Sequence, residues 1–309
     1  MTGEQRMANT VWILGSANID TTYRVKILPG RGETLTATTC VTATGGKGAN
    51  QACAAAHCGA HVSFIGAVGR DDMGEALLDA LRRRDIGTDC VTRADMNSGN
   101  AVIYVDDHGA NCIVVYPGAN RAIPTDMPAD FAPGDILAAQ LEINMDAVEA
   151  YFARAKACGA TTVLNPSPYT DIPAAVLSHT DLIIANETEA GALGGGEVSD
   201  AASAKACAGR ILALGPKAVV VTLGEHGAIL CTAEGAVAAD GYRVTVADTQ
   251  GAGDAFLGAF AARLAAGSGF EAALRFANAV GALAVTVHGS TQVSMPVLER
   301  VWNMLDNAQ

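Results

Sequence analysis

The sequence predicts an α/β fold, in which a doubly wound, mostly parallel sheet is flanked by helices and carries a small β-sheet lid. Half of the 309 residues are hydrophobic and 17% are charged, which is enough to bury a large core. From residue 136 onward, short apolar runs alternate with Ala-rich segments, the pattern of β-α units. Two β-like stretches interrupt this pattern earlier. We therefore expect a single domain over residues 1–309, with the lid formed by residues 17–44 and 97–117.

The first half of the chain supplies the lid and the first β-α units. Residues 21–44 are rich in Thr and Val and contain a Pro-Gly turn, without helical periodicity. Residues 100–116 predict two strands, joined by a hairpin turn over residues 106–111. Residues 1–9 are expected to be a leader or disordered, with Met7 as a possible natural start. The other elements expected here are strands at 11–14 and 62–68 and helices at 49–58 and 73–84.

The second half alternates more regularly. The expected strands are 136–141, 161–164, 182–185, 218–223, 228–231 and 242–247. The expected helices are 146–158, 201–214, 255–266 and 271–286. Such alternation favours a parallel sheet, whose ligands bind where the strands end.

The chain is organised around Asp248–Phe256, where small residues connect the strand expected at 242–247 to the helix expected at 255–266. Gly251, Ala252 and Gly253 would let a phosphate approach first-turn N–H groups that lack intrahelical partners. Asp254 adds a carboxylate to the same turn, and the helix dipole should favour its ionised form. This combination suggests phosphoryl transfer to a hydroxyl, with Asp254 accepting the proton.

Other interpretations of this segment have to be weighed. An Asp at a helix start is common for capping and dipole reasons alone. A dinucleotide-binding loop would need a third glycine at position 256, where this chain has Phe256. A Walker loop is also absent, because Gly45-Gly46-Lys47-Gly48 lacks the four-residue spacer and the Ser/Thr after lysine.

More polar side chains follow predicted strands. Asn18 and Asp20 are two residues apart and would share one face of an extended segment, although an Asx-turn would explain them equally. Lys47 and Asn50 follow a second glycine-rich helix entry at a spacing that lets both reach one ligand. Glu142, at the end of another strand, could be an ordinary solvated carboxylate.

Composition narrows the class of protein. The net charge of −12 argues against a nucleic-acid surface, because duplex binding depends on Lys and Arg. Eight scattered cysteines without a C-x-x-C pair indicate reduced thiols rather than disulfides or a zinc site. The apolar runs are too short for a signal sequence or a membrane span. We expect a soluble, cytoplasmic protein.

Together, these motifs resemble the ribokinase family of ATP-dependent sugar kinases, the PfkB-type carbohydrate kinases. The resemblance runs from about Val11 to Pro296, and two motifs carry it: Gly45-Gly46-Lys47-Gly48-Ala49-Asn50-Gln51 and Asp248-Thr249-Gln250-Gly251-Ala252-Gly253-Asp254. It implies a ribokinase-like fold, with ATP and Mg²⁺ as cofactors and K⁺ as activator. The first motif and the placement of Glu142 favour ribose over fructose or adenosine as the sugar.

The resemblance also implies roles for single residues. Asp254 matches the catalytic base, and Gly251, Ala252 and Gly253 match the anion hole. The sugar-binding positions correspond to Asn18, Asp20, Gly46, Lys47, Asn50, Glu142 and Asp254. The nucleotide positions correspond to Asn186, Glu189, Thr222, Gly224, Gly227, Gly253 and Asn278, with Glu189 also organising Mg²⁺ through water. A monovalent-cation loop corresponds to Asp248, Gln250, Ala284, Val287, Gly289 and Ser294; residues 289–294 form a segment one residue longer than is usual.

The resulting functional prediction is transfer of phosphate from ATP to the 5-hydroxyl of D-ribose, giving D-ribose 5-phosphate and ADP. Two alternatives remain: a kinase of the same fold acting on deoxyribose, another sugar or a nucleoside, and a sugar sensor without catalysis. The intact Asp254, anion hole and Asn186/Glu189 pair weigh against the sensor. The expected partners are the sugar, ATP and a second copy of the chain, bound through the lid.

Overall fold

A computed structural model describes residues 8–287 and 296–306 of the chain. It contains a nine-stranded sheet, ordered β13-β12-β11-β10-β9-β8-β1-β4-β5, and a four-stranded sheet, ordered β3-β2-β6-β7. The strands of the large sheet are β1 (Thr10–Leu14), β4 (His61–Gly69), β5 (Gly87–Ala94), β8 (Ile136–Ala139), β9 (Thr161–Leu164), β10 (Leu182–Asn186), β11 (Ala218–Thr222), β12 (Ala228–Thr232) and β13 (Gly235–Ala239). All its pairings are parallel except those of β12 and β13. The predicted doubly wound, mostly parallel sheet is therefore confirmed.

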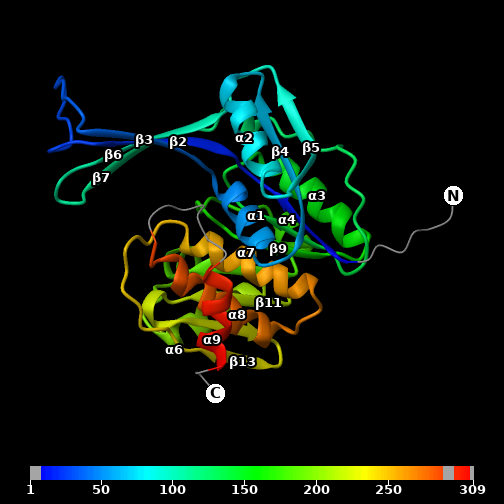
Figure 1. The fold of residues 1–309 in the computed structure, drawn as a ribbon. Helices are drawn as coiled ribbons and strands as arrows, with labels where there is room; N and C mark the ends of the chain where they lie inside the picture. The colour runs from blue at the N-terminus through cyan, green and yellow to red at the C-terminus, as the bar shows by residue number, and fades with distance from the viewer. Residues whose placement is uncertain (1–7, 288–295, 307–309) are drawn as a thin grey trace.

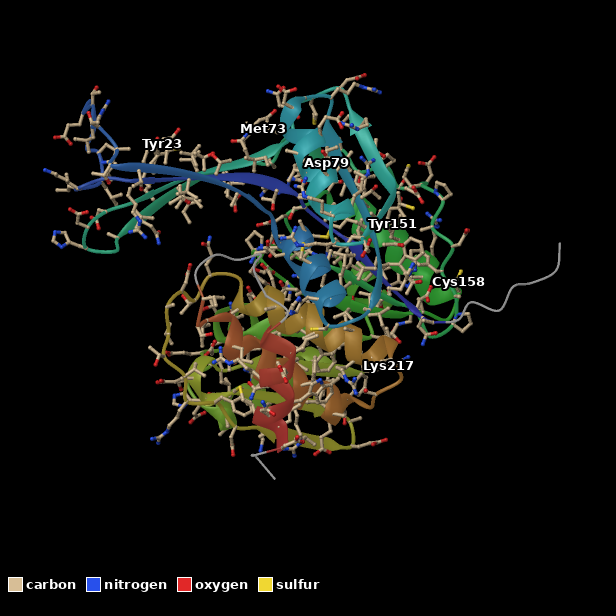
Figure 2. The ribbon with its side chains drawn as sticks, in the orientation of Figure 1. Tyr23, Met73, Asp79, Tyr151, Cys158 and Lys217 are labelled. Atoms are coloured by element: carbon tan, nitrogen blue, oxygen red, sulfur yellow. The ribbon has the colours of Figure 1, made fainter. Side chains whose placement is uncertain are left out.

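Helices cover both faces of the large sheet, which gives three layers. One face packs against α1 (Lys47–His57), α2 (Asp72–Arg82), α7 (Ala252–Ala265), α8 (Phe270–Ala284) and α9 (Pro296–Asp306). The other face packs against α3 (Met145–Ala157), α4 (Ala174–His179), α5 (Glu187–Gly194) and α6 (Ala201–Leu212), together with the 3-10 turn η1 (Gly118–Arg121). The turn η2 (Gly224–His226) connects β11 to β12. The core on the second face includes Tyr151 of α3, which is fully buried (Figure 2).

The small sheet projects from this body as an arm (Figure 1). It consists of β2 (Asn18–Arg24), β3 (Thr39–Gly45), β6 (Gly99–Val105) and β7 (Asn111–Tyr116), so it arises from the two segments predicted to form the lid. The β6–β7 pair is the expected hairpin. Tyr23 on this arm (Figure 2) stacks on Tyr104 of the neighbouring strand, with 5.8 Å between ring centroids.

One sequence prediction about secondary structure was wrong. Residues 242–247 do not form a strand, although Val244 and Val246 alternate. Strand β13, the edge of the large sheet, ends at Ala239; residues 242–247 pair with no described strand, and Val246 is 58% exposed. The connection is instead tied to the end of α8, because the N–H of Ala247 donates to the carbonyl of Val285 at 2.7 Å.

None of the helices in the described part of the chain is both long enough and apolar enough to cross a membrane. The expectation for residues 1–9 falls mainly on residues 1–7, which lie outside the described residues.

Candidate active site

Asp254 lies in the first turn of α7, where its carboxylate is held by two amides from α1. The side chain is 6% exposed. Asn50 Nδ2 donates to its Oδ2 at 3.0 Å, and Gln51 Nε2 donates to its Oδ1 at 3.0 Å. Helices α1 and α7 lie side by side in the middle of the molecule (Figure 1). The two glycine-rich motifs of the sequence therefore meet at one carboxylate.

The electrostatics of Asp254 differ from the sequence-based expectation. Burial raises the pKa of its carboxyl above the ordinary value, while the charge of Lys47 and the Asn50 and Gln51 amides lower it. The nearby charge of Glu142 raises the pKa further. We predicted that the helix dipole would favour the ionised form; burial acts in the opposite direction and is the largest influence on the pKa of this carboxyl. Donors to this carboxylate consequently matter for its protonation state.

The N-terminus of α7 is open in front of Asp254. Gly251 adopts a φ of 78°, a left-handed conformation that glycine favours, and within the described residues no side chain caps the helix. A Cβ atom added at Gly253 would meet no atom of the described residues within 4 Å. First-turn N–H groups facing open space beside small residues suit an anion.

The expected sugar-binding residues converge on the start of α1. Glu142 follows β8, and its Oε2 accepts hydrogen bonds from the Lys47 N–H at 3.1 Å and from Ser16 Oγ at 2.5 Å. Asp20 of β2 lies close to Gly45, where a Cβ atom would collide with its carboxylate. Burial, together with the charge of Glu142, raises the pKa of Asp20 to about 6.

Asn18 and Asn50 complete this side of the site. Asn18 Oδ1 accepts a hydrogen bond from Asn120 Nδ2 at 2.7 Å, and both side chains are buried. Gly46 has a φ of 88° and packs so closely that a Cβ atom would lie 3.0 Å from the Ala17 Cα. Among the described residues, the buried Oδ1 of Asn50 has no hydrogen-bond partner. A buried acceptor without a partner is costly, and a ligand hydroxyl would satisfy it.

The expected nucleotide residues lie at the carboxyl ends of β10 and β11. Asn186 and Thr222 are cross-strand partners, and Gly224 lies near the Glu187 carboxylate. Gly227, with a φ of 90°, ends the turn that follows. Asn278 comes from α8, and its Nδ2 donates to the carbonyl of Asp240 at 2.7 Å, beside a groove of about 780 Å³.

Asn186 and Glu189 form a capping box at the start of α5. The Glu189 N–H donates to Asn186 Oδ1 at 2.9 Å, and the Asn186 N–H donates to Glu189 Oε2 at 3.1 Å. The same Oε2 accepts a hydrogen bond from Asn165 Nδ2 at 3.3 Å. The pair thus has a structural role in addition to any role toward phosphate or magnesium.

Four of the residues predicted for the cation loop lie in two adjacent segments. The N–H groups of Ala247 and Asp248 both donate to the carbonyl of Val285, which brings residues 247–250 beside residues 284–287. The Gln250 N–H donates to Asp248 Oδ1 at 2.9 Å. Asp248, Gln250, Ala284 and Val287 therefore lie in two adjacent segments, whereas Gly289 and Ser294 lie outside the described residues.

Five polar residues that the sequence analysis did not assign to the site support it from behind: Ser16, Gln51, Asn120, Gln140 and Asn165. Gln140 and Asn165 directly follow β8 and β9, and polar residues at strand ends could have been noticed as candidates. Gln51 is the last residue of the Gly45–Gln51 motif, and Ser16 lies two residues before Asn18.

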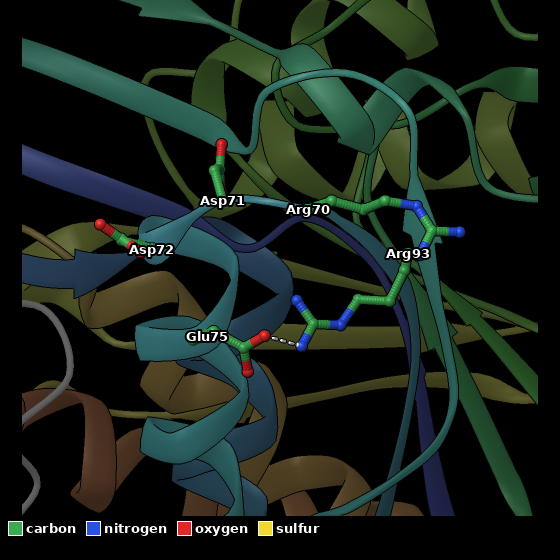
Figure 3. Close-up of a pocket in the computed structure, with 5 residues that line it drawn as sticks. All are labelled: Arg70, Asp71, Asp72, Glu75 and Arg93. Carbon is green, nitrogen blue, oxygen red and sulfur yellow. Dashed lines mark hydrogen bonds and ion pairs between the residues drawn. The ribbon is translucent and has the colours of Figure 1, made fainter.

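A separate hollow of about 290 Å³ lies at the N-terminus of α2 (Figure 3). Its arginines are neutralised locally, because Arg93 pairs with Glu75 and Arg70 pairs with Asp95. Asp71 in its wall accepts hydrogen bonds from the N–H and Oγ of Ser98, directly before β6. This cluster anchors the base of the arm to α2.

Comparison with known proteins identifies the family of the chain. Residues 8–298 match the model of the pfkB family of carbohydrate kinases. The chain is 39% identical to ribokinase of Staphylococcus aureus (strain COL) over 302 residues, which cover 96% of this chain and 99% of the relative. It is 33% identical to deoxyribokinase of Salmonella typhi over 294 residues, 93% of this chain and 96% of the relative.

The fold is also close to a solved structure. The structure of Arabidopsis thaliana ribokinase complexed with ribose and ATP superimposes with a TM-score of 0.88 at 31% identity, covering 96% of this chain and 99% of that one. The match to the family model spans both glycine-rich motifs, Asp254 and the arm. The chain belongs to the PfkB family of carbohydrate kinases.

Proposed function

We propose that this chain is an ATP-dependent kinase that phosphorylates the 5-hydroxyl of D-ribose, giving D-ribose 5-phosphate and ADP. One observation carries the proposal: the buried carboxylate of Asp254, fixed by two amides, lies at the open N-terminus of α7. A proton acceptor directly beside an anion-accepting helix end suits phosphoryl transfer to a hydroxyl. The ribokinase relatives and the ribose-bound Arabidopsis structure point to the sugar.

The sugar would occupy the space bordered by β2, the start of α1 and Glu142. Asp20 and Glu142 are hydrogen-bond acceptors, Lys47 is a cationic donor, and Asn50 offers an unpartnered Oδ1. A dense set of acceptors and donors matches a small polyol, because each hydroxyl can both donate and accept. Such a site discriminates against analogues that lack a hydroxyl and leave its groups unpaired.

The reaction would proceed by attack of the sugar oxygen on the γ-phosphorus, while the bond to the bridging oxygen of ADP breaks. Asp254 would orient the hydroxyl and take its proton as the new P–O bond forms. The N–H groups of Gly251, Ala252 and Gly253 would stabilise the charge on the transferring phosphoryl oxygens. Because burial raises the pKa of Asp254, this base should lose activity on the acidic side.

The nucleotide would lie along the ends of β10 and β11, near Asn186, Thr222 and Gly224, with Gly227 and Asn278 farther along. Magnesium bound to its phosphates would neutralise charge on the phosphoryl group. We propose Glu189 as its contact through water.

A monovalent cation such as K⁺ would act differently. Asp248 and nearby carbonyls of residues 284–287 would hold it beside the segment that leads into the α7 N-terminus. Bound there, it would stiffen the loop that carries the anion-binding N–H groups. We propose K⁺ as an activator that touches neither substrate.

The arm would serve as a lid over the sugar and as a dimer interface. Its edge strands β3 and β7 carry exposed apolar side chains: Val41, Ile113, Val114, Val115 and Tyr116 are each at least 46% exposed. A two-edged apolar sheet that protrudes from the body favours pairing with a second copy. We propose a homodimer formed through these strands, with the rest of the chain acting as one catalytic domain.

The experiment that tests the function is ADP release with a panel of D-ribose, 2-deoxy-D-ribose, D-fructose and adenosine. We expect the highest kcat/KM with ribose. The deoxyribokinase relative makes 2-deoxyribose the sharpest competitor. A higher value for any other acceptor would refute the assignment of ribose, and ADP release with none of them would refute the kinase.

Asp254→Asn serves as the mechanistic arm of this test. The substitution keeps the shape of the side chain but removes the proton acceptor. We expect kcat to fall by roughly 10²–10⁴-fold with sugar and ATP binding retained. A variant that kept more than about a tenth of wild-type kcat would contradict the role of Asp254 as base.

A further inference from the structure

A chain of buried amides lies behind Asp254, on the side away from the open helix end. Gln51 Nε2 donates to Asp254 Oδ1 at 3.0 Å, and Gln51 Oε1 accepts a hydrogen bond from Gln140 Nε2 at 2.7 Å. Both glutamines are 0% exposed. They therefore face neither solvent nor substrate, and their hydrogen bonds have to be explained within the protein.

The hydrogen bonds run in one donor-to-acceptor direction, from Gln140 through Gln51 to Asp254, and the carboxylate of Asp254 determines this direction. An ionised carboxylate can only accept hydrogen bonds, so Gln51 must turn its NH₂ group toward Asp254. The Gln140 NH₂ group, bonded to Gln51 Oε1, stabilises this orientation of the amide. A reversed Gln51 would place its oxygen against the carboxylate and its NH₂ group against that of Gln140.

The second hydrogen of the Gln51 NH₂ group points toward another functional element. Asn165 Oδ1 lies 3.5 Å from Gln51 Nε2, and Asn165 Nδ2 donates to the carbonyl of Ile184 and to Glu189 Oε2. The polar atoms of Gln51 are thus all engaged. This fixes the Gln51 side chain between Asp254 and Asn165, which in turn donates to Glu189.

We propose that Gln51 is a positioning residue, which keeps the Asp254 carboxylate ionised and aimed, and that Gln140 sets the direction of the Gln51 amide. The inference rests on the proposed function, in which Asp254 is the base. Asn50 makes the other bond to Asp254, but its side chain also faces the sugar site. Gln51 is instead fully buried, so its bond to Asp254 is made without any contact to the sugar site.

The charges around Asp254 explain why such a donor matters. Lys47 of α1 favours the carboxylate, whereas burial and Glu142, which follows β8, favour the neutral acid. A hydrogen bond that is made only to the charged form lowers the pKa of the acceptor. Removal of the Gln51 donor should therefore raise the pKa of Asp254 further and leave less of the base ionised at neutral pH.

The test is the pH dependence of kcat/KM in Gln51→Met, which keeps the length of the side chain without its polar atoms. We expect the acidic limb of the profile to move up by about one pH unit, the size expected for one charge-assisted bond. Above that limb, activity should return to within about threefold of wild type. A fall in activity that is equal at every pH would overturn the proposal.

The role of Gln140 is tested with Gln140→Met and the double variant. If Gln140 acts only through Gln51, its single substitution moves the limb by less than Gln51→Met does. The double variant should then match Gln51→Met alone. Additive shifts would refute the ordering of the chain. Thr180→Val is the matched control, because it removes a hydrogen bond of a 0% exposed side chain from the connection between α4 and β10. It should lower thermal stability without moving the limb.

A second readout does not depend on activity. A ¹³C-NMR titration of the Asp254 carboxyl, assigned by its absence in Asp254→Asn, measures its pKa in the sugar-free protein. We expect a higher value in Gln51→Met than in wild type, and an unchanged value would overturn the inference. If wild type phosphorylates none of the acceptors, the proposed function fails, and this titration still decides the role of Gln51.

Discussion

Gly258→Ala should separate the two helices that hold the catalytic carboxylate. Gly258 lies on α7 one turn beyond Asp254, and it faces α1 one turn beyond Asn50 and Gln51. A Cβ atom at this position would lie 2.5 Å from the Gln51 carbonyl oxygen, 2.6 Å from the Ala54 Cβ and 2.8 Å from the Ala55 nitrogen. Since ordinary contact begins at 3.4 Å, the helices have to move apart by 0.6–0.9 Å.

The same displacement acts on the bonds to Asp254. Hydrogen bonds of 3.0 Å would lengthen to about 3.6–3.9 Å, beyond the usual limit. We expect kcat to fall by roughly 10- to 100-fold, as for other displacements of about 1 Å at an active site. The free energy of unfolding should fall by about 1–3 kcal/mol from overpacking.

Steady-state kinetics and urea unfolding measure the two effects, and Gly209→Ala is the matched control. Gly209 lies inside α6, and a Cβ atom there would meet nothing within 4 Å. Alanine should therefore stabilise the protein by about 0.5–1 kcal/mol and leave activity unchanged. If Gly258→Ala stabilised the protein to a similar extent with full kcat, the close approach of α1 and α7 would have no functional meaning.

The remaining predictions concern the lid residue Asp20, the cation loop and the arm. The folded-state pKa of Asp20 is about 6, above the ordinary 3.8, so its stabilising contribution is complete below about pH 4 and is lost as the pH rises through 6. The Asp20→Asn variant has no carboxyl to ionise and therefore lacks this loss. Urea unfolding should show its stability relative to wild type rising by about 1–2 kcal/mol between pH 4.5 and 7.5. A difference that stays constant with pH would contradict the burial of Asp20. Replacement of K⁺ by tetramethylammonium at constant ionic strength should lower kcat, and an unchanged rate would remove the cation from the mechanism. Light scattering at micromolar concentration should give twice the 31.4 kDa chain mass for wild type and one chain mass for Ile113→Lys; a monomeric wild type would exclude the arm as a dimer interface.

Much of the fold could be predicted because its signals are local. Apolar runs such as 182–185 in β10 are long enough to be recognised as buried strands, and the hairpin of β6 and β7 has its own turn residues at 106–111. The small sheet was predictable because Thr- and Val-rich segments break the α/β rhythm. Glycine-rich segments that lead into a helix can also be recognised from the sequence alone. Asp254, Lys47 and Asn50 were predicted as site residues because they lie in such segments.

The sequence analysis was incomplete where a structural property depends on tertiary contacts, which a single sequence does not reveal. Residues 242–247 alternate like a strand, but they pair with no described strand, and the segment is fixed instead by the hydrogen bond from the Ala247 N–H to the carbonyl of Val285. The pKa of Asp254 depends on how completely α1, α7 and the loop after β8 exclude water around it. A helix-dipole argument considers one helix alone and therefore leaves out this loss of water.

The buried amides show most clearly what the sequence could not provide. Gln51, Gln140 and Asn165 come from three separate elements, and each would pass as an ordinary polar residue if considered alone. The order β8-β1-β4 on one side and β9-β10 on the other brings the ends of β8 and β9 next to α1. Only then do both ends of the Gln51 and Asn165 amides find partners, whereas among the described residues Gln140 is bonded through its Nε2 and its buried Oε1 has no partner. An amide with the wrong orientation would leave two buried polar groups unpaired, at a cost of about 1–3 kcal/mol each. The orientation of each amide therefore depends on the other members of the network. The preference for an ionised Asp254 results from the strand order that brings these amides together, and no single sequence motif encodes it.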